Sequence, residues 1–138
     1  MTSIEKIREF IQEQTGIKNS FKNTDDLDFD LGVYGDDMFE LVEKYSEEFD
    51  VDISEFLWYF HTGEEGFSGI GGLISKPPNK LVAHIPITAN LLLRFANEGS
   101  WNLNYSAHSV PGKRVDLAIN KYILILFLLI AIILLVWN

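Results

Sequence analysis

The sequence predicts an all-α protein in which a small helical domain precedes a single C-terminal transmembrane helix. In the first hundred residues, apolar side chains recur at helical spacing, with capping residues before these runs and glycines after them. Residues 122–137 then form an unbroken apolar stretch. We place the helical domain at residues 1–101, a basic linker at 102–121 and the transmembrane helix at 122–137.

The first helix is expected at residues 4–15. Thr2 and Glu5 have the spacing of a capping box, and Gly16 is a typical helix stop. One face of this helix carries Ile4, Ile7, Phe10 and Ile11. The polar stretch 18–35 is too long for a turn, and we interpret it as a loop whose apolar side chains reach the core.

The second helix is expected to begin near Asp36 or Asp37 and to have one apolar and one acidic face. Asp37 and Glu40 again have cap spacing. The apolar stripe comprises Met38, Leu41, Val42, Tyr45 and Phe49. The acidic residues of this helix are Asp36, Asp37, Glu40, Glu43, Glu47 and Glu48.

Two further helices are expected before the membrane span. Ser54 is a candidate cap for a short third helix that ends at Phe60. Residues 62–80 are rich in glycine and carry two prolines, which predicts a mobile connection. A fourth helix is expected from Thr88 to Asn97, with Gly99 as its stop and an apolar face of Leu91, Leu92 and Phe95.

The apolar stretch 122–137 favours a membrane span over the alternatives. At about 1.5 Å per residue it covers roughly 24 Å, somewhat less than the roughly 30 Å hydrocarbon core, and snorkelling by Lys121 can cover the difference. Tyr122 and Trp137 lie where interfacial aromatic residues are common. A buried core helix would keep a polar stripe, and an interfacial helix would have a polar face.

The charges that flank the span predict its orientation. Lys113, Arg114 and Lys121 precede it, and only Asn138 follows it. The positive-inside rule then places the helical domain in the cytoplasm, with the span as a tail anchor. The first ten residues contain acidic side chains and no apolar run, so they do not predict a signal peptide.

The charge distribution limits the classes of partner. Residues 1–60 carry 16 acidic and 5 basic side chains, whereas residues 61–138 carry 4 acidic and 6 basic ones. Such an acidic domain repels nucleic acid and suits a partner with a basic patch. With no cysteine in the chain, disulfides and thiol chemistry are excluded.

No catalytic, cofactor or metal site is predicted. Asp26, Asp28 and Asp30 have the initial spacing of a calcium loop, but Leu31 and Asp37 occupy the positions that need Gly and Glu. The glycines of residues 66–72 lack the lysine and hydroxyl of a phosphate loop. The three histidines, His61, His84 and His108, have no ligand spacing.

Four segments resemble acyl carrier proteins. The strongest is DLGVYGDDMFEL at residues 30–41, which is similar to the carrier segment that begins Asp-Leu-Gly and ends Val-Glu-Leu. EEFDVDI at 47–53 and IQEQTGI at 11–17 continue the likeness, and ITANLLLRFAN at 87–97 echoes it. The resemblance implies a carrier-like helical bundle.

A narrower resemblance is to the bacterial domain of unknown function 1493 family, which is carrier-like in fold. It is carried by Gly-Asp-Asp at residues 35–37, WYF at 58–60, and the block from Ile85 to Trp101 that begins IPIT and ends GSW. Together with the C-terminal span, a bacterial family predicts a location at the inner membrane.

The carrier resemblance fails where the prosthetic group would attach. Carriers hold phosphopantetheine on the serine of Asp-Ser-Leu, and the aligned residues here are Tyr34, Gly35 and Asp36. Gly35 has no hydroxyl, and it can equally serve to supply a turn before the helix. A displaced attachment site at Ser46 is the less favoured alternative.

The resemblance implies a carrier fold that keeps its docking face without its prosthetic group. In carriers the second helix meets basic patches on partner enzymes, so the six acidic residues from Asp36 to Glu48 become the candidate partner-binding residues. We therefore predict a non-enzymatic, membrane-tethered adaptor. The alternatives are an unusual acyl carrier modified at another serine, and a small single-span subunit or regulator of a membrane complex.

Overall fold

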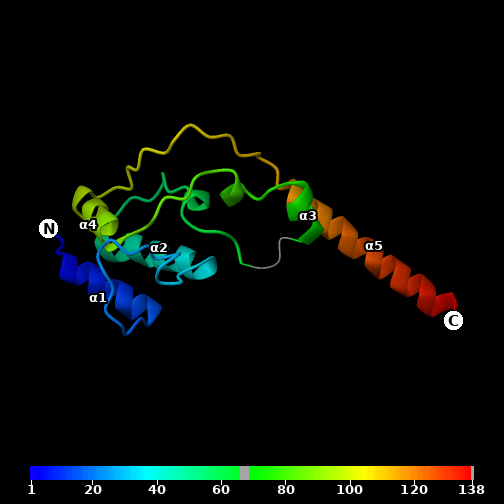
Figure 1. The fold of residues 1–138 in the computed structure, drawn as a ribbon, viewed down its shortest axis with the longest axis horizontal. Helices are drawn as coiled ribbons and strands as arrows, with labels where there is room; N and C mark the ends of the chain where they lie inside the picture. Colours follow the sequence, from blue (N-terminus) through cyan, green and yellow to red (C-terminus); the bar gives the residue numbers. More distant parts are fainter. Residues whose placement is uncertain (66–68, 138) are drawn as a thin grey trace.

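The computed structural model describes residues 1–65 and 69–137, and within these ranges the protein is all-helical. The helices are α1 (Ile4–Thr15), α2 (Asp36–Phe49), α3 (Gly69–Ile74), α4 (Ala89–Glu98) and α5 (Val115–Trp137), with the short 3₁₀ turns η1 (Trp58–Phe60) and η2 (Pro78–Lys80). Figure 1 shows α1, α2 and α4 gathered at one end, with α5 projecting from the other. The predicted fold class, helical domain plus C-terminal apolar helix, is confirmed.

The helix ends follow local chemistry, but not always the predicted residue. Ser3, not Thr2, caps α1 by accepting a hydrogen bond from the Lys6 amide, and Gly16 ends the helix in the left-handed conformation. Thr88 caps α4 through the Leu91 amide at 3.1 Å, as expected, and Gly99 ends it.

The start of α2 differs from its prediction. Gly35 occupies the N-cap position, and no side chain there caps the helix, so the predicted Asp37 and Glu40 capping pair is wrong. The left-handed Asp50 ends α2, a conformation that Asp tolerates better than most residues.

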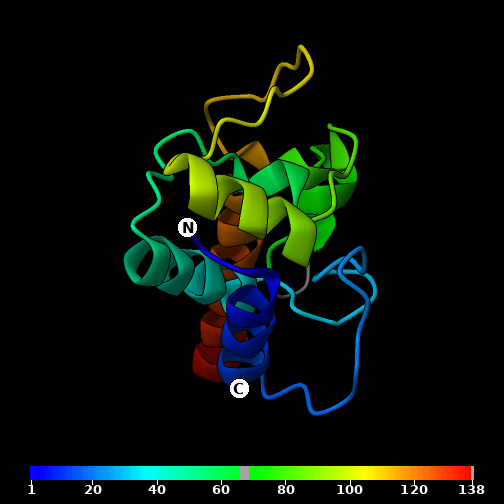
Figure 2. The same ribbon diagram turned by 90° about the vertical axis from the view of Figure 1, so that its left-hand side faces the viewer.

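The core lies between α1, α2 and α4, which cross one another in Figure 2. Its helical side chains match the predicted stripes, except that Ile4, Phe49 and Leu91 are only partly buried. The hydroxyl of Tyr45 donates to the Leu92 carbonyl at 2.6 Å and joins α2 to α4 inside the core. The fully buried core residues on these helices are Ile7, Ile11, Met38, Tyr45, Leu92 and Phe95.

The expected third helix is wrong for most of its length. Only η1 is helical, and Ser54 is in a turn in which its amide donates to Asp52 Oδ1 at 2.9 Å. The segment after α2 instead pairs with the segment after α4. The Asp52 amide donates to the Gly99 carbonyl at 3.0 Å, and the Asp52 carbonyl accepts from the Trp101 amide at 2.8 Å. These backbone bonds hold Trp101 in the core.

The glycine-rich connection is also more regular than predicted. Residues 69–74 form α3, which packs along the first turns of α5, and residues 66–68 lie outside the described residues. The helix α5 begins at Val115, ahead of the apolar stretch at 122, because its first turns are held by polar contacts described below. Tyr105 and His108 also contact the domain, so the chain remains attached to it beyond Trp101.

Candidate functional site

The acidic face of α2 is fully displayed to solvent. All six predicted partner-binding residues are exposed: Asp36, Asp37, Glu40, Glu43, Glu47 and Glu48. Within the described ranges, Glu40 is the single member of the six with an ion pair, to Lys44 at 2.6 Å, and this contact lowers the pKa of the Glu40 carboxyl. Five carboxylates on one helix therefore remain available to an external cation.

A hollow of about 200 Å³ adjoins the first half of this face, between α2, the end of α1 and the loop before α2. Its lining includes apolar side chains that are buried or partly buried and charged side chains that are exposed: Ile17, Leu31, Leu41, Asp37, Glu40 and Lys44. Two of the six predicted residues thus border a concave, partly apolar surface. Acidic side chains beside a partly apolar hollow suit a ligand that carries both a cation and a hydrophobic side chain.

Gly35 precedes the acidic face and is fixed by the backbone. Its φ of 58° favours glycine, and its amide donates to Thr62 Oγ1 at 3.0 Å in the interior. A Cβ at this position would overlap the Glu65 side chain. The conformation therefore favours glycine at the residue aligned with the carrier serine, and a side chain there would also have to displace that of Glu65.

Replacing Gly35 by serine is expected to destabilise the domain by about 1–3 kcal/mol, because a side chain there must adopt a disfavoured conformation. Urea unfolding of the variant measures this loss. Adding Glu65→Ala to the serine variant should recover only the part of the lost stability that comes from overlap with the Glu65 side chain. Gly112→Ser is the matched control, since Gly112 has no positive φ and no neighbour within 4 Å of its Cβ position; an equal loss in the control would contradict the account.

The alternative attachment residue, Ser46, is engaged within the fold. Its hydroxyl donates to the Val51 carbonyl at 2.7 Å, across the C-terminal end of α2. This bond stabilises the turn at Asp50 rather than presenting the hydroxyl to solvent.

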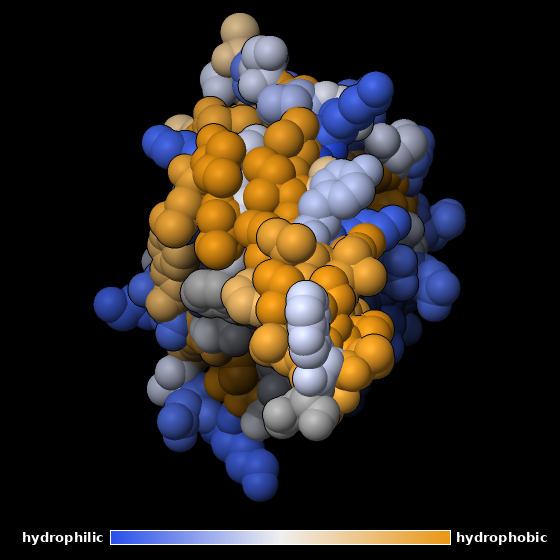
Figure 3. Space-filling model, turned by 90° about the vertical axis from the view of Figure 1, so that its right-hand side faces the viewer, coloured by the Kyte–Doolittle hydropathy of each residue, from blue (hydrophilic) through white to orange (hydrophobic). Residues whose placement is uncertain are grey.

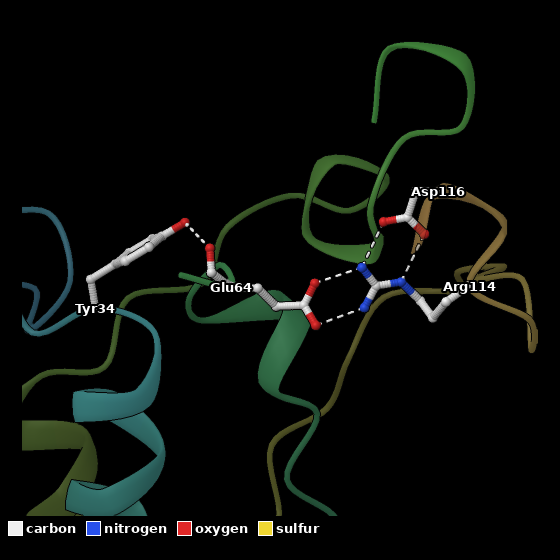
Figure 4. A network of polar contacts seen from close by, with 4 residues as sticks. All are labelled: Tyr34, Glu64, Arg114 and Asp116. Carbon is white, nitrogen blue, oxygen red and sulfur yellow. Dashed lines mark hydrogen bonds and ion pairs between the residues drawn. The ribbon is translucent and has the colours of Figure 1, made fainter. Parts of the chain in front are cut away.

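An ion-pair network connects the loop before α2 to α5 (Figure 4). The Tyr34 hydroxyl donates to the Glu64 carbonyl at 3.2 Å. Arg114 then forms paired contacts with the Glu64 carboxylate at 2.6 and 2.7 Å and with the Asp116 carboxylate at 2.6 and 3.0 Å. Sequence analysis missed this network because Glu64 and Arg114 are 50 positions apart.

A buried polar cluster around His61 and Tyr105 joins η1 to the segment that follows α4. The Tyr105 oxygen accepts hydrogen bonds from Trp101 Nε1 at 2.9 Å and from the Leu57 amide at 3.2 Å. Its own proton therefore points to His61 Nε2, at 2.9 Å, and His61 Nδ1 donates to the Ile85 carbonyl at 2.8 Å. Every polar atom of the His61 ring is satisfied in the neutral form, and burial lowers the pKa of His61 to about 4.

The cluster predicts a loss of stability in mild acid. The unfolded His61 has a pKa near 6.5, so between about pH 6.5 and 4 the unfolded chain binds a proton that the folded one does not. The contribution of His61 to the free energy of unfolding is complete above pH 6.5, and about 3 kcal/mol of it is lost as the pH falls to about 4. We expect His61→Gln to flatten this part of the profile in urea unfolding. An unchanged slope would contradict a neutral buried His61.

The aspartates with the initial spacing of a calcium loop accept hydrogen bonds from backbone amides in the same loop. Asp26 Oδ1 accepts from the Asp28 amide at 3.2 Å, and Asp30 Oδ2 accepts from the Asp26 amide at 2.8 Å. Asp26 also pairs with His84 at 2.5 Å, and the His84 ring stacks on Phe29. Among residues 1–65 and 69–137, no group of three acidic or histidine side chains is arranged to hold a metal ion.

Comparison with known proteins identifies a family for the helical domain. A family model described as "Protein of unknown function (DUF1493)" matches residues 1–104. No curated protein and no solved structure matches the chain.

Proposed function

The chain belongs to the family Protein of unknown function (DUF1493), and we propose that it is a membrane-tethered, non-enzymatic adaptor that binds a basic protein partner through the acidic face of α2. The family match covers the helical domain and ends before α5 begins at Val115. The proposal accordingly has two parts, an anchor in α5 and a binding face on α2.

The composition and exposure of α5 support its role as the anchor. Residues 122–137 of α5 are uncharged and span about 24 Å, and snorkelling by Lys121 covers the difference from the roughly 30 Å hydrocarbon core of a bilayer. None of its most apolar window is buried against the protein, unlike a core helix of a soluble domain. Lys113, Arg114 and Lys121 near its first turns favour a cytoplasmic location for the domain.

The single observation that carries the binding function is the acidic face beside its hollow. Carboxylates without ionic partners, next to a partly apolar concavity, can attract a basic surface and seat one of its side chains. Exposed charge pairs alone contribute little energy, so the hollow supplies the contact that charge cannot. Tethering at the membrane raises the local concentration of the domain and reduces the affinity it needs.

The conformation of Gly35 favours an adaptor over an acyl carrier. We propose that the domain is carrier-like in ancestry and has lost its attachment serine at this position. The positive φ of Gly35, the overlap of any side chain there with Glu65, and the engaged Ser46 hydroxyl all oppose a phosphopantetheine attachment. An unmodified intact mass of the protein taken from its own membranes is the expected result, and a mass raised by phosphopantetheine would contradict it.

The binding proposal is tested by neutralising part of the acidic face. The triple change Glu43→Gln, Glu47→Gln and Glu48→Gln removes three exposed charges, and we expect a partner that co-purifies from detergent-solubilised membranes to be lost. High salt should weaken the wild-type complex in the same way.

The matched control removes three exposed acidic charges from α1, by Glu5→Gln, Glu9→Gln and Glu13→Gln. This variant should keep the partner, because its net charge changes equally while α2 stays acidic. Equal retention by both triple variants would contradict the assignment to α2.

A further inference from the structure

The short helix α3 presents a bare hydrophobic surface. Ile70, Leu73 and Ile74 are 51%, 86% and 68% exposed, although this segment is only six residues long. Three large apolar side chains so close together on a surface commonly mark an interaction site.

Close backbone contact fixes α3 to the first turns of α5. The Gly71 amide donates to Asn120 Oδ1 at 2.8 Å, and a Cβ on Gly71 would overlap the carbonyl oxygen of Asp116. A Cβ on Gly69, whose φ is 60°, would likewise overlap the Asn120 side chain. Glycines let the two helices touch, so the depth of α5 sets the depth of α3.

That depth is the boundary between lipid headgroups and acyl chains. The first turns of α5 carry Asp116, Asn120 and Lys121, whose polar and charged side chains are costly to place in hydrocarbon, whereas the stretch 122–137 that follows is uncharged. The polar turns therefore lie in the headgroup region, with α3 beside them. Figure 3 looks at this end of the molecule and shows hydrophobic side chains extending from α5 over the neighbouring surface.

The positive charges near α3 are also suited to the headgroup region of a bilayer. Lys76 follows α3 by two residues and is exposed, as is Lys121 on α5. Lysines at this level can pair with anionic headgroups while the apolar side chains enter the lipid.

We infer that α3 is a second membrane contact, in which Ile70, Leu73 and Ile74 insert at the headgroup boundary beside α5. The inference rests on the proposed anchoring by α5. Together with the Arg114 network, this contact fixes how the acidic domain is oriented on the bilayer, whereas a single span alone would let it rotate.

Fluorescence quenching in lipid vesicles tests the inference on the full chain. Because the protein has no cysteine, Leu73→Cys can carry a single environment-sensitive probe. The vesicles contain phosphatidylethanolamine, phosphatidylglycerol and a lipid spin-labelled near its headgroup. Lys6→Cys, at an exposed position on α1, is the aqueous control. Leu128→Cys, in the middle of α5, is the membrane control, and it is measured with a lipid that is spin-labelled deep in its acyl chain.

We expect a blue-shifted probe at position 73 that the headgroup-labelled lipid quenches strongly, and no quenching at position 6. Quenching at 128 with none at 73 would overturn the role of α3 and leave anchoring intact. Self-quenching between probes at 73 would show that a second copy covers α3, and would also overturn it. Loss of quenching at 128 would contradict the anchor itself.

Discussion

Removal of residues 122–138 is expected to move the protein completely from the membrane to the soluble fraction. The deletion starts after Lys121, so the contacts of Asp116 and Asn120 with α3 are kept. Every buried hydrophobic residue of the core lies between Ile7 and Trp101, and none is removed. Insertion of a transmembrane helix is effectively irreversible, so the effect should be all-or-none in sedimentation after alkaline extraction.

A matched variant separates anchoring from recognition by α5. Replacing residues 122–137 with an unrelated hydrophobic span of equal length should restore membrane attachment and also keep the partner. The span contains no polar residue and no small-residue spacing suited to tight helix pairing, which favours this result. Restored attachment without the partner would favour a single-span subunit that is recognised through its helix.

Replacing Trp101 by alanine is expected to lower the free energy of unfolding by about 3–5 kcal/mol, the usual cost of deleting a large buried aromatic side chain. Trp101 is 1% exposed, and its ring packs against Phe56 and Phe95 with centroids 4.9 and 4.8 Å away. The change also removes a hydrogen bond to Tyr105. Such a loss is a large part of the roughly 5–15 kcal/mol that stabilises a typical domain.

Urea unfolding followed by circular dichroism measures this effect. Trp58→Ala provides the control, because Trp58 is only partly buried and its neighbouring rings, Tyr59 and Phe39, lie 5.7 and 5.8 Å away. The control should lose clearly less stability than the Trp101 variant. Equal losses would contradict the central place of Trp101 in the core.

Sequence periodicity was sufficient to locate the helices that build the core. In α1, α2 and α4, the apolar spacing and the residues that cap or end the helix indicate the same segment. The structure places each of these helices within a residue or so of its predicted bounds. The predicted caps were less reliable. Ser3 and Thr2 have the same chemistry, and only the backbone geometry decides which of them caps α1.

The features that sequence did not predict depend on tertiary contacts. The helix α3 contains three glycines, which are poor helix formers, and it is stabilised by packing on α5. His61 gains its role from Tyr105, 44 positions away. The acidic residues could be listed from sequence, but their exposure and the adjoining hollow required the positions of α1 and the loop before α2.

Site-specific photo-cross-linking in native membranes tests the central claim most directly. A photoreactive residue at position 47, on the acidic face, is compared with one at position 9, exposed on α1. The account predicts a discrete cross-linked protein from position 47, absent from position 9 and lost at high salt. Identical products from both positions, or none from position 47 in membranes that retain the protein, would contradict an acidic docking face on α2.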